Sequence, residues 1–429
     1  MNLPYNLKRV STAFLSLSFC LIGISQTTKT EMKLDLNKTG GVYFAYPVKD
    51  FVNTPAPIGY KPFYISHYGR HGSRYLISTN DYLWLRDLLL KAKNEDALTP
   101  VGTDVLGRIE TVIEETNGRG GDLSPLGVRQ HRGIAERMYA NYPEVFADSI
   151  SISARSTLVV RCVLSMDAFC ERLKEINPSL KITRESSQKY MPYLCYGSPE
   201  SDEYRKQWKE EGRKFKEKNT HPERLVNLIF KDDEFVRKNV NPVDFMWGMY
   251  YLASGMQDIE TPVSFYDIFT FDELFDLWQV FNFDFYAGSG NYEGNNGLMI
   301  ANATNLLDNI IESADMALMQ KEPSATLRFG HDGNLIPLAG ILEFPAAIGK
   351  TGDPDKVYEV FAEYKVSPMA GNVQIVFYKS DDETNPVLVK FLLNEEEQVI
   401  PVKTDMWPYY KWDEVKKYYG NSPYRSKKE

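Results

Sequence analysis

The sequence predicts an α/β core that is interrupted by a mostly helical insertion. Near the start, a strand, a glycine-containing turn and a helix follow one another over residues 61–98, which is the opening of an α/β unit. A strand and a helix follow one another again over residues 324–342, and between these two parts the chain has helical periodicity and few strand signals. The core domain is therefore predicted to be discontinuous in sequence.

The first 25 residues are predicted to be a secretory signal peptide rather than part of the fold. Lys8 and Arg9 precede the apolar stretch "VSTAFLSLSFCLIGIS", which contains many small residues. An apolar run of roughly 15 residues is shorter than the ~20 needed to span a bilayer, so no stable membrane anchor is expected. We expect cleavage after residue 25, and a secreted or periplasmic protein.

The charge of the chain limits the ligands that it can bind. The 429 residues carry a net charge of −9, which becomes −11 when the leader takes Lys8 and Arg9 with it. A protein this acidic is not a general nucleic-acid binder, so an anionic ligand has to be met by a local group of cations. We expect a monomer whose partner is a small molecule.

The cysteines do not form a recognisable framework. Cleavage removes Cys20 and leaves Cys162, Cys170 and Cys195, an odd number without a CxxC pair. One disulfide with a free thiol and three buried thiols both remain open.

The predicted core consists of residues 26–184 and 300–429, and the predicted cap of residues 185–299. In chain order, the core is expected to contain a strand at 61–68, helices at 80–98 and after Pro125, a strand at 148–156, helices at 157–176 and 301–320, a strand at 324–332, a helix from Asn334, and a hairpin at 372–394. The cap contains seven cations between Arg205 and Lys218, interspersed with acidic residues. A solvated helix face and a surface that receives phosphates are both compatible with this run.

The segment "RHGSR" follows the first strand and has the composition of a phosphate site. Arg70 and Arg74 cannot lose their charge, and guanidinium groups bind phosphate oxygens in a bidentate manner. His71 lies between them and can attack phosphorus as a nucleophile, while Gly72 allows close approach of backbone. A surface turn with two unrelated arginines is the alternative.

A second strand end, in "LRFGHDGNLIPL", carries complementary chemistry. His331 can donate a hydrogen bond to a phosphate oxygen beside a helix start, which favours anions. Asp332 can donate a proton to a departing alkoxide if its surroundings keep it protonated. The alternative role of Asp332 is to cap the helix that begins at Asn334.

"RHGSR" together with a distant "GHDGN" resembles the histidine acid phosphatases, the larger branch of the histidine phosphatase superfamily. "GDLSPLGVRQ" and "RCVLSMDAF" are similar to further helices of that family. The resemblance implies a phosphoglycerate-mutase-like three-layer core with a helical cap. It also implies a third phosphate-binding arginine, which by this match is Arg161, with Arg155 as the alternative.

Within the family, "RHGSRYL", "LLDNIIESADMAL" and "LRFGHD" are most similar to the multiple inositol polyphosphate phosphatases. Two positions depart from that pattern. Leu76 stands where the family usually has proline, and Asp332-Gly333 follows His331 where the inositol polyphosphate group usually has Ala-Glu. Gly333 cannot donate a proton, so the resemblance to the His-Asp phytases assigns that role to Asp332.

The implied activity is hydrolysis of phosphomonoesters of the inositol polyphosphate type, without a metal or other cofactor. His71 would form a phosphohistidine, Arg70, Arg74, Arg161 and His331 would stabilise the transferring group, and Asp332 would protonate the leaving oxygen. A general acid phosphatase acting on sugar phosphates or nucleotides, and a non-catalytic phospholigand-binding module, are the alternatives. His67 and His131 are expected to be structural, hydrogen-bonded histidines.

Overall fold

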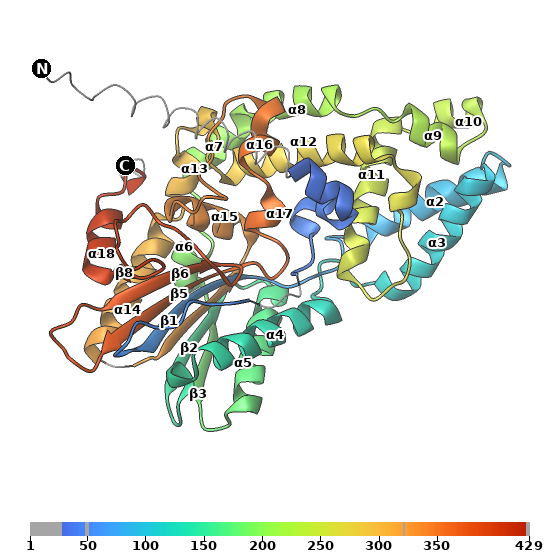
Figure 1. Ribbon diagram of the computed structural model, residues 1–429. Coiled ribbons are helices and arrows are strands. Elements are labelled where there is room, and N and C mark those ends of the chain that lie inside the picture. Colours follow the sequence, from blue (N-terminus) through green and yellow to red (C-terminus); the bar gives the residue numbers. More distant parts are fainter. Residues whose placement is uncertain (1–27, 48–50, 321, 426–429) are drawn as a thin grey trace, which may run out of the picture.

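The computed structural model describes residues 28–47, 51–320 and 322–425 (Figure 1). The predicted signal peptide, residues 1–25, lies outside the described residues, and its cleavage stays a prediction. In the described part of the chain, no helix is both long and apolar enough to cross a membrane.

One mixed sheet forms the centre of the molecule. Its strands are β1 (Tyr60–Arg70), β2 (Ser151–Ser156), β3 (Lys181–Ser186), β4 (Ala325–Gly330), β5 (Asn372–Ser380), β6 (Leu388–Leu393), β7 (Glu396–Glu397) and β8 (Tyr410–Lys411). Their order is β3-β2-β4-β1-β5-β6-β7, and β8 pairs with β6. Strands β3, β2, β4 and β1 are parallel, whereas β5 to β8 pair antiparallel.

Helices cover both faces of this sheet. Alternate residues of one strand point to opposite faces, and accordingly Tyr64 and Ile65 of β1 belong to two different hydrophobic clusters. The Ile65 cluster contains residues of α4 (Pro125–Asn141) and α5 (Val160–Ile176), which lie together under the sheet in Figure 1. The Tyr64 cluster contains residues of the helices on the other face, α14 (Thr304–Gln320), α15 (Asp332–Ile341) and α18 (Trp412–Gly420). The predicted three-layer α/β core is confirmed.

Between β3 and β4 the chain is almost entirely helical. The elements there are η3 (Gln188–Tyr190), α6 (Met191–Leu194), α7 (Pro199–Gln207), α8 (Lys209–Lys218), α9 (Glu223–Ile229), α10 (Asp233–Asn239), α11 (Pro242–Gly255), η4 (Met256–Asp258), η5 (Tyr266–Ile268), α12 (Phe271–Ser289), η6 (Glu293–Asn295), α13 (Leu298–Ala301) and α14. Helices α2 (Asn80–Asn94) and α3 (Pro100–Thr116), which precede β2 in the sequence, pack against α11 and α9. The helical part thus draws on two stretches of chain, and the domain boundaries at residues 185 and 299 stay a prediction.

The short elements complete the chain. They are η1 (Leu36–Tyr43), η2 (Pro143–Phe146), η7 (Pro354–Lys356), α16 (Val357–Val360) and α17 (Glu363–Val366). The predicted hairpin at 372–394 is formed by β5 and β6. Strand β3 is the one long strand that the sequence analysis missed, because "KITRES" is charged and most of its residues are exposed.

The register of the parallel strands brings distant residues together. Arg70, the last residue of β1, pairs with Gly330, the last residue of β4, and Ser156 of β2 pairs with Phe329. Parallel strands end at the same edge of a sheet, where ligands collect in α/β folds. His71, Thr157 and His331, the residues that follow these three strands, therefore meet at that edge.

Candidate functional site

Helices α4 and α5 hold the turn after β1. The amide of Gly72 donates to Ser165 Oγ in α5 at 3.1 Å, and the amide of Ser73 donates to Gln130 Oε1 in α4 at 2.8 Å. The carbonyl of Ser73 accepts from the amide of Ser124, the N-cap of α4, at 2.9 Å. These bonds fix a turn whose sequence contains no regular element of its own.

Gly72 allows the turn to touch helix α4 directly. A Cβ atom on Gly72 would lie 2.6 Å from the Cα of Gly127, and a Cβ on Gly127 would lie 2.3 Å from the carbonyl oxygen of Ser73. Real Cβ atoms do not approach backbone so closely, so both positions require glycine. The turn is consequently packed backbone to backbone on the first turn of α4.

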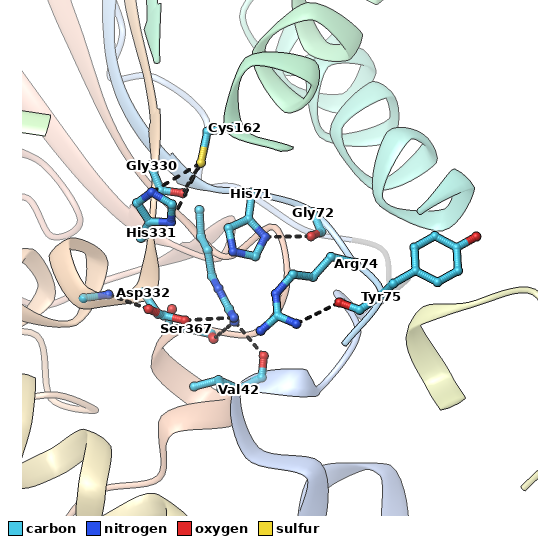
Figure 2. A network of polar contacts seen from close by, with 12 residues as sticks. Val42, His71, Gly72, Arg74, Tyr75, Cys162, Gly330, His331, Asp332 and Ser367 are labelled. Carbon is cyan, nitrogen blue, oxygen red and sulfur yellow. Dashed lines mark hydrogen bonds and ion pairs between the residues drawn. The ribbon is translucent and has the colours of Figure 1, made fainter. Parts of the chain in front are cut away.

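His71 lies in this turn with a fixed tautomer. The residue is 2% exposed, and its Nδ1 lies 2.9 Å from the carbonyl oxygen of Gly72. Figure 2 shows this contact. A carbonyl only accepts, so Nδ1 carries the hydrogen and Nε2 carries the lone pair. Burial, followed by the charges of Arg70, Arg74 and Arg161, lowers the pKa of His71 well below its usual value. The ring is neutral and nucleophilic at Nε2.

The side chain of Arg70 is held rigidly behind His71. It is fully buried, and its Nη1 donates to the carbonyl oxygens of Val42 at 2.6 Å and Ser367 at 2.8 Å. Its Nη2 forms an ion pair with Oδ2 of Asp332 at 2.9 Å. Burial lowers the pKa of Arg70. The usual pKa of a guanidinium is so high that the group still keeps its charge.

Arg74 presents a second guanidinium to the same space (Figure 2). Its Nη1 donates to the carbonyl oxygen of Tyr75 at 2.9 Å, and the group lies 5.1 Å from the ring centre of Tyr43. Its buried Nε has no hydrogen-bond partner among the described residues. Donor capacity is therefore left for a ligand.

His331 faces His71 from the neighbouring strand end. The two ring centres are 5.7 Å apart, and Nε2 of His331 lies 3.2 Å from Oγ1 of Thr157, which follows β2. Burial, opposed by the charge of Asp332, lowers the pKa of His331 to about 4. The ring is neutral near pH 7 and donates from one nitrogen.

Asp332 occupies a different helical position from the one predicted. Helix α15 begins at Asp332 rather than at Asn334, and its N-cap residue is His331. Oδ1 of Asp332 accepts from the amide of Gly333 at 2.7 Å, and Oδ2 pairs with Arg70. Burial by itself would raise the pKa of Asp332. The charges of Arg70 and His331 lower it by more, so the net pKa is below its usual value. Without a ligand, this carboxyl is ionised at neutral pH.

The structure distinguishes between the two candidate arginines on and before α5. The charge of Arg161 lowers the pKa of His71 and interacts with Arg74 and Asp332. Arg155 instead donates to the hydroxyl of Tyr193 at 3.0 Å, and its Nε forms an ion pair with Oε2 of Glu185 in β3 at 3.5 Å. Arg161 is thus the third arginine of the cluster.

Sequence reasoning missed the residues that support the cluster. Val42 and Ser367 contribute only backbone oxygens, and Thr157 and Asp258 belong to no motif. Gln130 ends the segment "GDLSPLGVRQ", but the sequence assigned it no role. The strand-end position of Thr157 was the one available signal. The others become visible only when segments that are distant in the sequence are brought together.

His67 and His131 are buried, as expected of structural residues, but their environment is aromatic. His67 lies 5.3 Å from the ring of Phe169, and both histidines contact Phe329. Neither nitrogen of His131 has a hydrogen-bond partner among the described residues. The backbone of Arg70 is the polar group that acts on the His131 ring, and burial lowers the pKa of each histidine to about 3.

The basic run of the cap is mostly a solvated face. Ion pairs to acidic side chains engage Arg205, Lys206, Arg213, Lys214 and Lys218. Lys216 differs, because it lies 4.5 Å from the ring centre of Trp247 and is the member of this run that lines the cavity of about 370 Å³ beside Tyr43. That cavity is also lined by Tyr43, Leu76, Asp81, Trp84, Asp244, Trp247, Gly248 and Tyr251.

A backbone hydrogen bond explains why leucine, and not the proline usual in the family, occupies position 76. Its amide donates to the hydroxyl of Tyr82 at 2.8 Å. Proline has no amide hydrogen and would leave that hydroxyl without its donor. The side chain of Leu76 is buried.

The described residues contain neither a cluster of metal-ligating side chains nor a disulfide. No group of three or more His, Cys, Asp or Glu side chains in these ranges is arranged to hold a metal ion. Cys162, Cys170 and Cys195 are all free thiols, of which Cys195 is exposed. The alternative with one disulfide is therefore wrong.

Comparisons with known proteins agree with this arrangement. Residues 69–394 match the family model described as the histidine phosphatase superfamily (branch 2). A sequence comparison with curated proteins finds no significant match.

Solved structures share the fold. The multiple inositol polyphosphate phosphatase of Bifidobacterium longum, complexed with inositol hexasulfate, is 20% identical with a TM-score of 0.72, over 88% of this chain and 97% of that chain. The phytase from D. castellii is 15% identical with a TM-score of 0.67, over 90% and 85% of the two chains. A Hafnia alvei phytase with myo-inositol hexakis sulphate is 14% identical with a TM-score of 0.52, over 86% and 99%.

Proposed function

Because this chain belongs to branch 2 of the histidine phosphatase superfamily, a family of phosphoric monoester hydrolases, we propose that it hydrolyses inositol polyphosphates through a phosphohistidine on His71. The observation that carries this proposal is the fixed tautomer of His71. Its Nδ1–H is bonded to Gly72, so the lone pair on Nε2 is available beside Arg70, Arg74 and Arg161.

The proposed reaction has two steps. Nε2 of His71 attacks phosphorus, the bond between phosphorus and the ester oxygen breaks, and Asp332 gives its proton to that oxygen. Water then attacks phosphorus and gives a proton to Asp332, the bond between phosphorus and Nε2 of His71 breaks, and inorganic phosphate leaves. Charge on the transferring oxygens is stabilised by Arg70, Arg74, Arg161 and His331, and this is expected to be the largest contribution to catalysis.

The proton on Asp332 depends on the substrate. Arg70 keeps the pKa of this carboxyl low while the site is empty. A bound phosphate adds negative charge next to Arg70 and weakens its effect on Asp332, which raises the pKa. The donor is therefore protonated most readily in the substrate complex and at acidic pH.

The names of the structural neighbours support an inositol polyphosphate as substrate, since they include a multiple inositol polyphosphate phosphatase and phytases. One observation favours the second candidate, a general phosphatase of sugar phosphates. The 370 Å³ cavity beside Tyr43 is lined by two carboxylates, Asp81 and Asp244, and by a single lysine, Lys216. Carboxylates accept hydrogen bonds from free hydroxyls and repel additional phosphates.

The deciding experiment is release of phosphate from phytate and from a panel of sugar phosphates, in the presence of a chelator. Wild-type protein is expected to hydrolyse phytate, and His71→Ala to lose activity by orders of magnitude while keeping its melting temperature. Acid-labile phosphate trapped on the wild type should map to His71. Near-normal turnover by His71→Ala would contradict the mechanism, and a protein that binds but never turns over these esters would be the non-catalytic module.

Export remains part of the proposal. The predicted leader at residues 1–25 supports it, and an N-terminal sequence of the mature protein that begins after residue 25 is the expected result. A mature chain that retains Met1 would contradict it.

A further inference from the structure

A buried carboxylate that the proposed mechanism does not use lies behind the turn that carries His71. Asp258, the last residue of η4, is fully buried. Its Oδ1 accepts a hydrogen bond from Ser73 Oγ at 2.6 Å, and Ser73 Oγ in turn accepts from Nε2 of Gln130 at 2.8 Å. Ser73 stands between His71 and Arg74, so this contact links the turn to the helical part of the chain.

The other oxygen of Asp258 is not used by the protein. Oδ2 is buried and has no hydrogen-bond partner among the described residues, and the same is true of Nε of Arg74. The positive charges that act on Asp258 are those of Arg74 and Arg70. The carboxyl therefore lies within electrostatic range of two of the guanidinium groups assigned to the site.

The charge of Asp258 depends on pH. Burial raises its pKa to about 8, although Ser73, Arg74 and Arg70 each lower it. The other titratable groups that face it are the hydroxyls of Tyr82 and Tyr266, whose pKa values burial raises. Both hydroxyls stay neutral, so Asp258 is the group of this cluster that changes charge near pH 8.

We propose that Asp258 is a positioning residue of this site, because it fixes the turn between His71 and Arg74 through Ser73. When Asp258 is ionised, its negative charge weakens anion binding by Arg70 and Arg74. The inference rests on the proposed function, since it takes the two arginines to be the phosphate-binding groups. The carboxylate of Asp258 repels an anion that is bound to the two arginines. The anion therefore binds more tightly when Asp258 is protonated.

Sulfate is the probe for the electrostatic half of the proposal. It carries two charges throughout the range between about pH 6 and pH 9, unlike phosphate. In the anion-free protein, the pKa of His331 is about 4, and the pKa values of Asp332 and His71 are below their usual values. A bound anion raises the pKa values of neighbouring groups, so the difference in pH dependence between the wild type and Asp258→Asn is the quantity that reports on Asp258.

The affinity for sulfate is to be measured by calorimetry at both ends of this range. For the wild type we expect about fivefold weaker binding at the alkaline end, because a pKa raised by one unit leaves Asp258 about half protonated in the complex there. Asp258→Asn should show little dependence on pH, and should bind about fivefold more tightly than wild type at the alkaline end. The control Glu260→Gln removes a half-exposed carboxylate two residues away, paired with Arg129, and should behave as wild type.

The outcomes separate the two proposals. Sulfate binding that is independent of pH in the wild type, or equally dependent on pH in Asp258→Asn, would overturn the role of Asp258 and leave the phosphatase intact. Failure of the wild type to bind sulfate at any pH would overturn the anion site itself, and this inference with it.

Turnover tests the positioning half. Ser73→Ala removes the hydroxyl that joins Gln130 to Asp258, and we expect kcat to fall at least about tenfold with a smaller change in KM, because a displaced nucleophile affects the chemical step. Asp258→Asn keeps an oxygen acceptor for Ser73 and should retain more of kcat than Asp258→Ala. Equal kcat in Ser73→Ala and wild type would overturn the positioning role, even if Asp258→Ala fails to fold.

Discussion

At the scale of single residues, Asp332 and Arg70 form the pair whose balance decides the chemistry. Their contact at 2.9 Å keeps the carboxyl ionised in the empty site, whereas the proposed role requires a proton. From the sequence alone, that role was conditional on the surroundings of Asp332. A buried guanidinium in direct contact is a feature that no sequence pattern reveals.

The leaving group should determine how much Asp332 matters. An inositol alkoxide needs a proton when it departs, while p-nitrophenolate does not. Asp332→Asn is expected to slow phytate hydrolysis about a hundredfold and p-nitrophenyl phosphate hydrolysis by only a few fold, measured as kcat. Slight and equal effects on both substrates would show that the bond to the Gly333 amide is the whole role of Asp332.

The dependence of phytate hydrolysis on pH follows from the same pair. Asp332 must be protonated, and Arg70 lowers its pKa, so kcat/KM should rise as pH falls from neutrality toward that pKa. Asp332→Asn should lose this rise. The measurement is kcat/KM from neutral to acidic pH for both proteins, and an alkaline optimum in the wild type would contradict the assignment.

Arg161 and Arg155 provide a matched pair of arginines. Removing Arg161 should raise KM and lower kcat, together by about a hundredfold in kcat/KM, because its charge acts on the substrate and on the transition state. Arg155→Ala should leave kcat/KM within about twofold, since its contacts are to Tyr193 and Glu185. The reverse pattern would mean that the chosen arginine is wrong.

At the scale of elements, the site depends on how the turn after β1 meets the first turn of helix α4. Strands rich in branched and aromatic residues, such as β1 and β5, were predictable from sequence because both their faces are buried. His71 and His331 were predictable because they follow such strands. The sequence indicated that Gly72 allows close approach of backbone, but its partner Gly127 could not be predicted, because the two glycines lie in segments that only the fold brings together.

A methyl group at Gly127 should disturb this contact. Gly127→Ala places a Cβ atom 2.3 Å from the carbonyl oxygen of Ser73, and we expect a loss of about 1–3 kcal/mol in unfolding free energy together with reduced kcat. Gly107→Ala in α3 is the control, because a Cβ there meets nothing within 4 Å and should preserve stability. The measurements are urea unfolding and turnover of both variants, and equal behaviour would disprove the close packing.

At the scale of the whole molecule, low pH favours the proposed proton donor and opposes the folded state. His67 and His131 are buried without charge, with pKa values of about 3, whereas the unfolded chain protonates them below about pH 6.5. Between these values the unfolded state binds more protons, so stability falls as the pH falls. Each histidine contributes at most about 1.4 kcal/mol per pH unit to this loss.

Replacing one of these histidines should therefore improve tolerance of acid. His131→Leu removes one of the groups that the unfolded chain protonates, and its unfolding free energy should fall less steeply between about pH 6 and pH 4 than that of the wild type. Urea unfolding at several pH values measures both slopes. Identical slopes would mean that His131 is protonated in the folded protein.

Strand β3 has a consequence for the protein in concentrated solution. It forms one edge of the sheet, where unpaired backbone groups can add a strand from another molecule and start aggregation. Lys181, Arg184 and Glu185 place charge on this edge and make such pairing unfavourable. The charged residues that made β3 difficult to predict from sequence therefore also protect the protein from aggregation. Exchanging Lys181 and Glu185 for valine should increase light scattering on storage while leaving turnover per folded molecule unchanged.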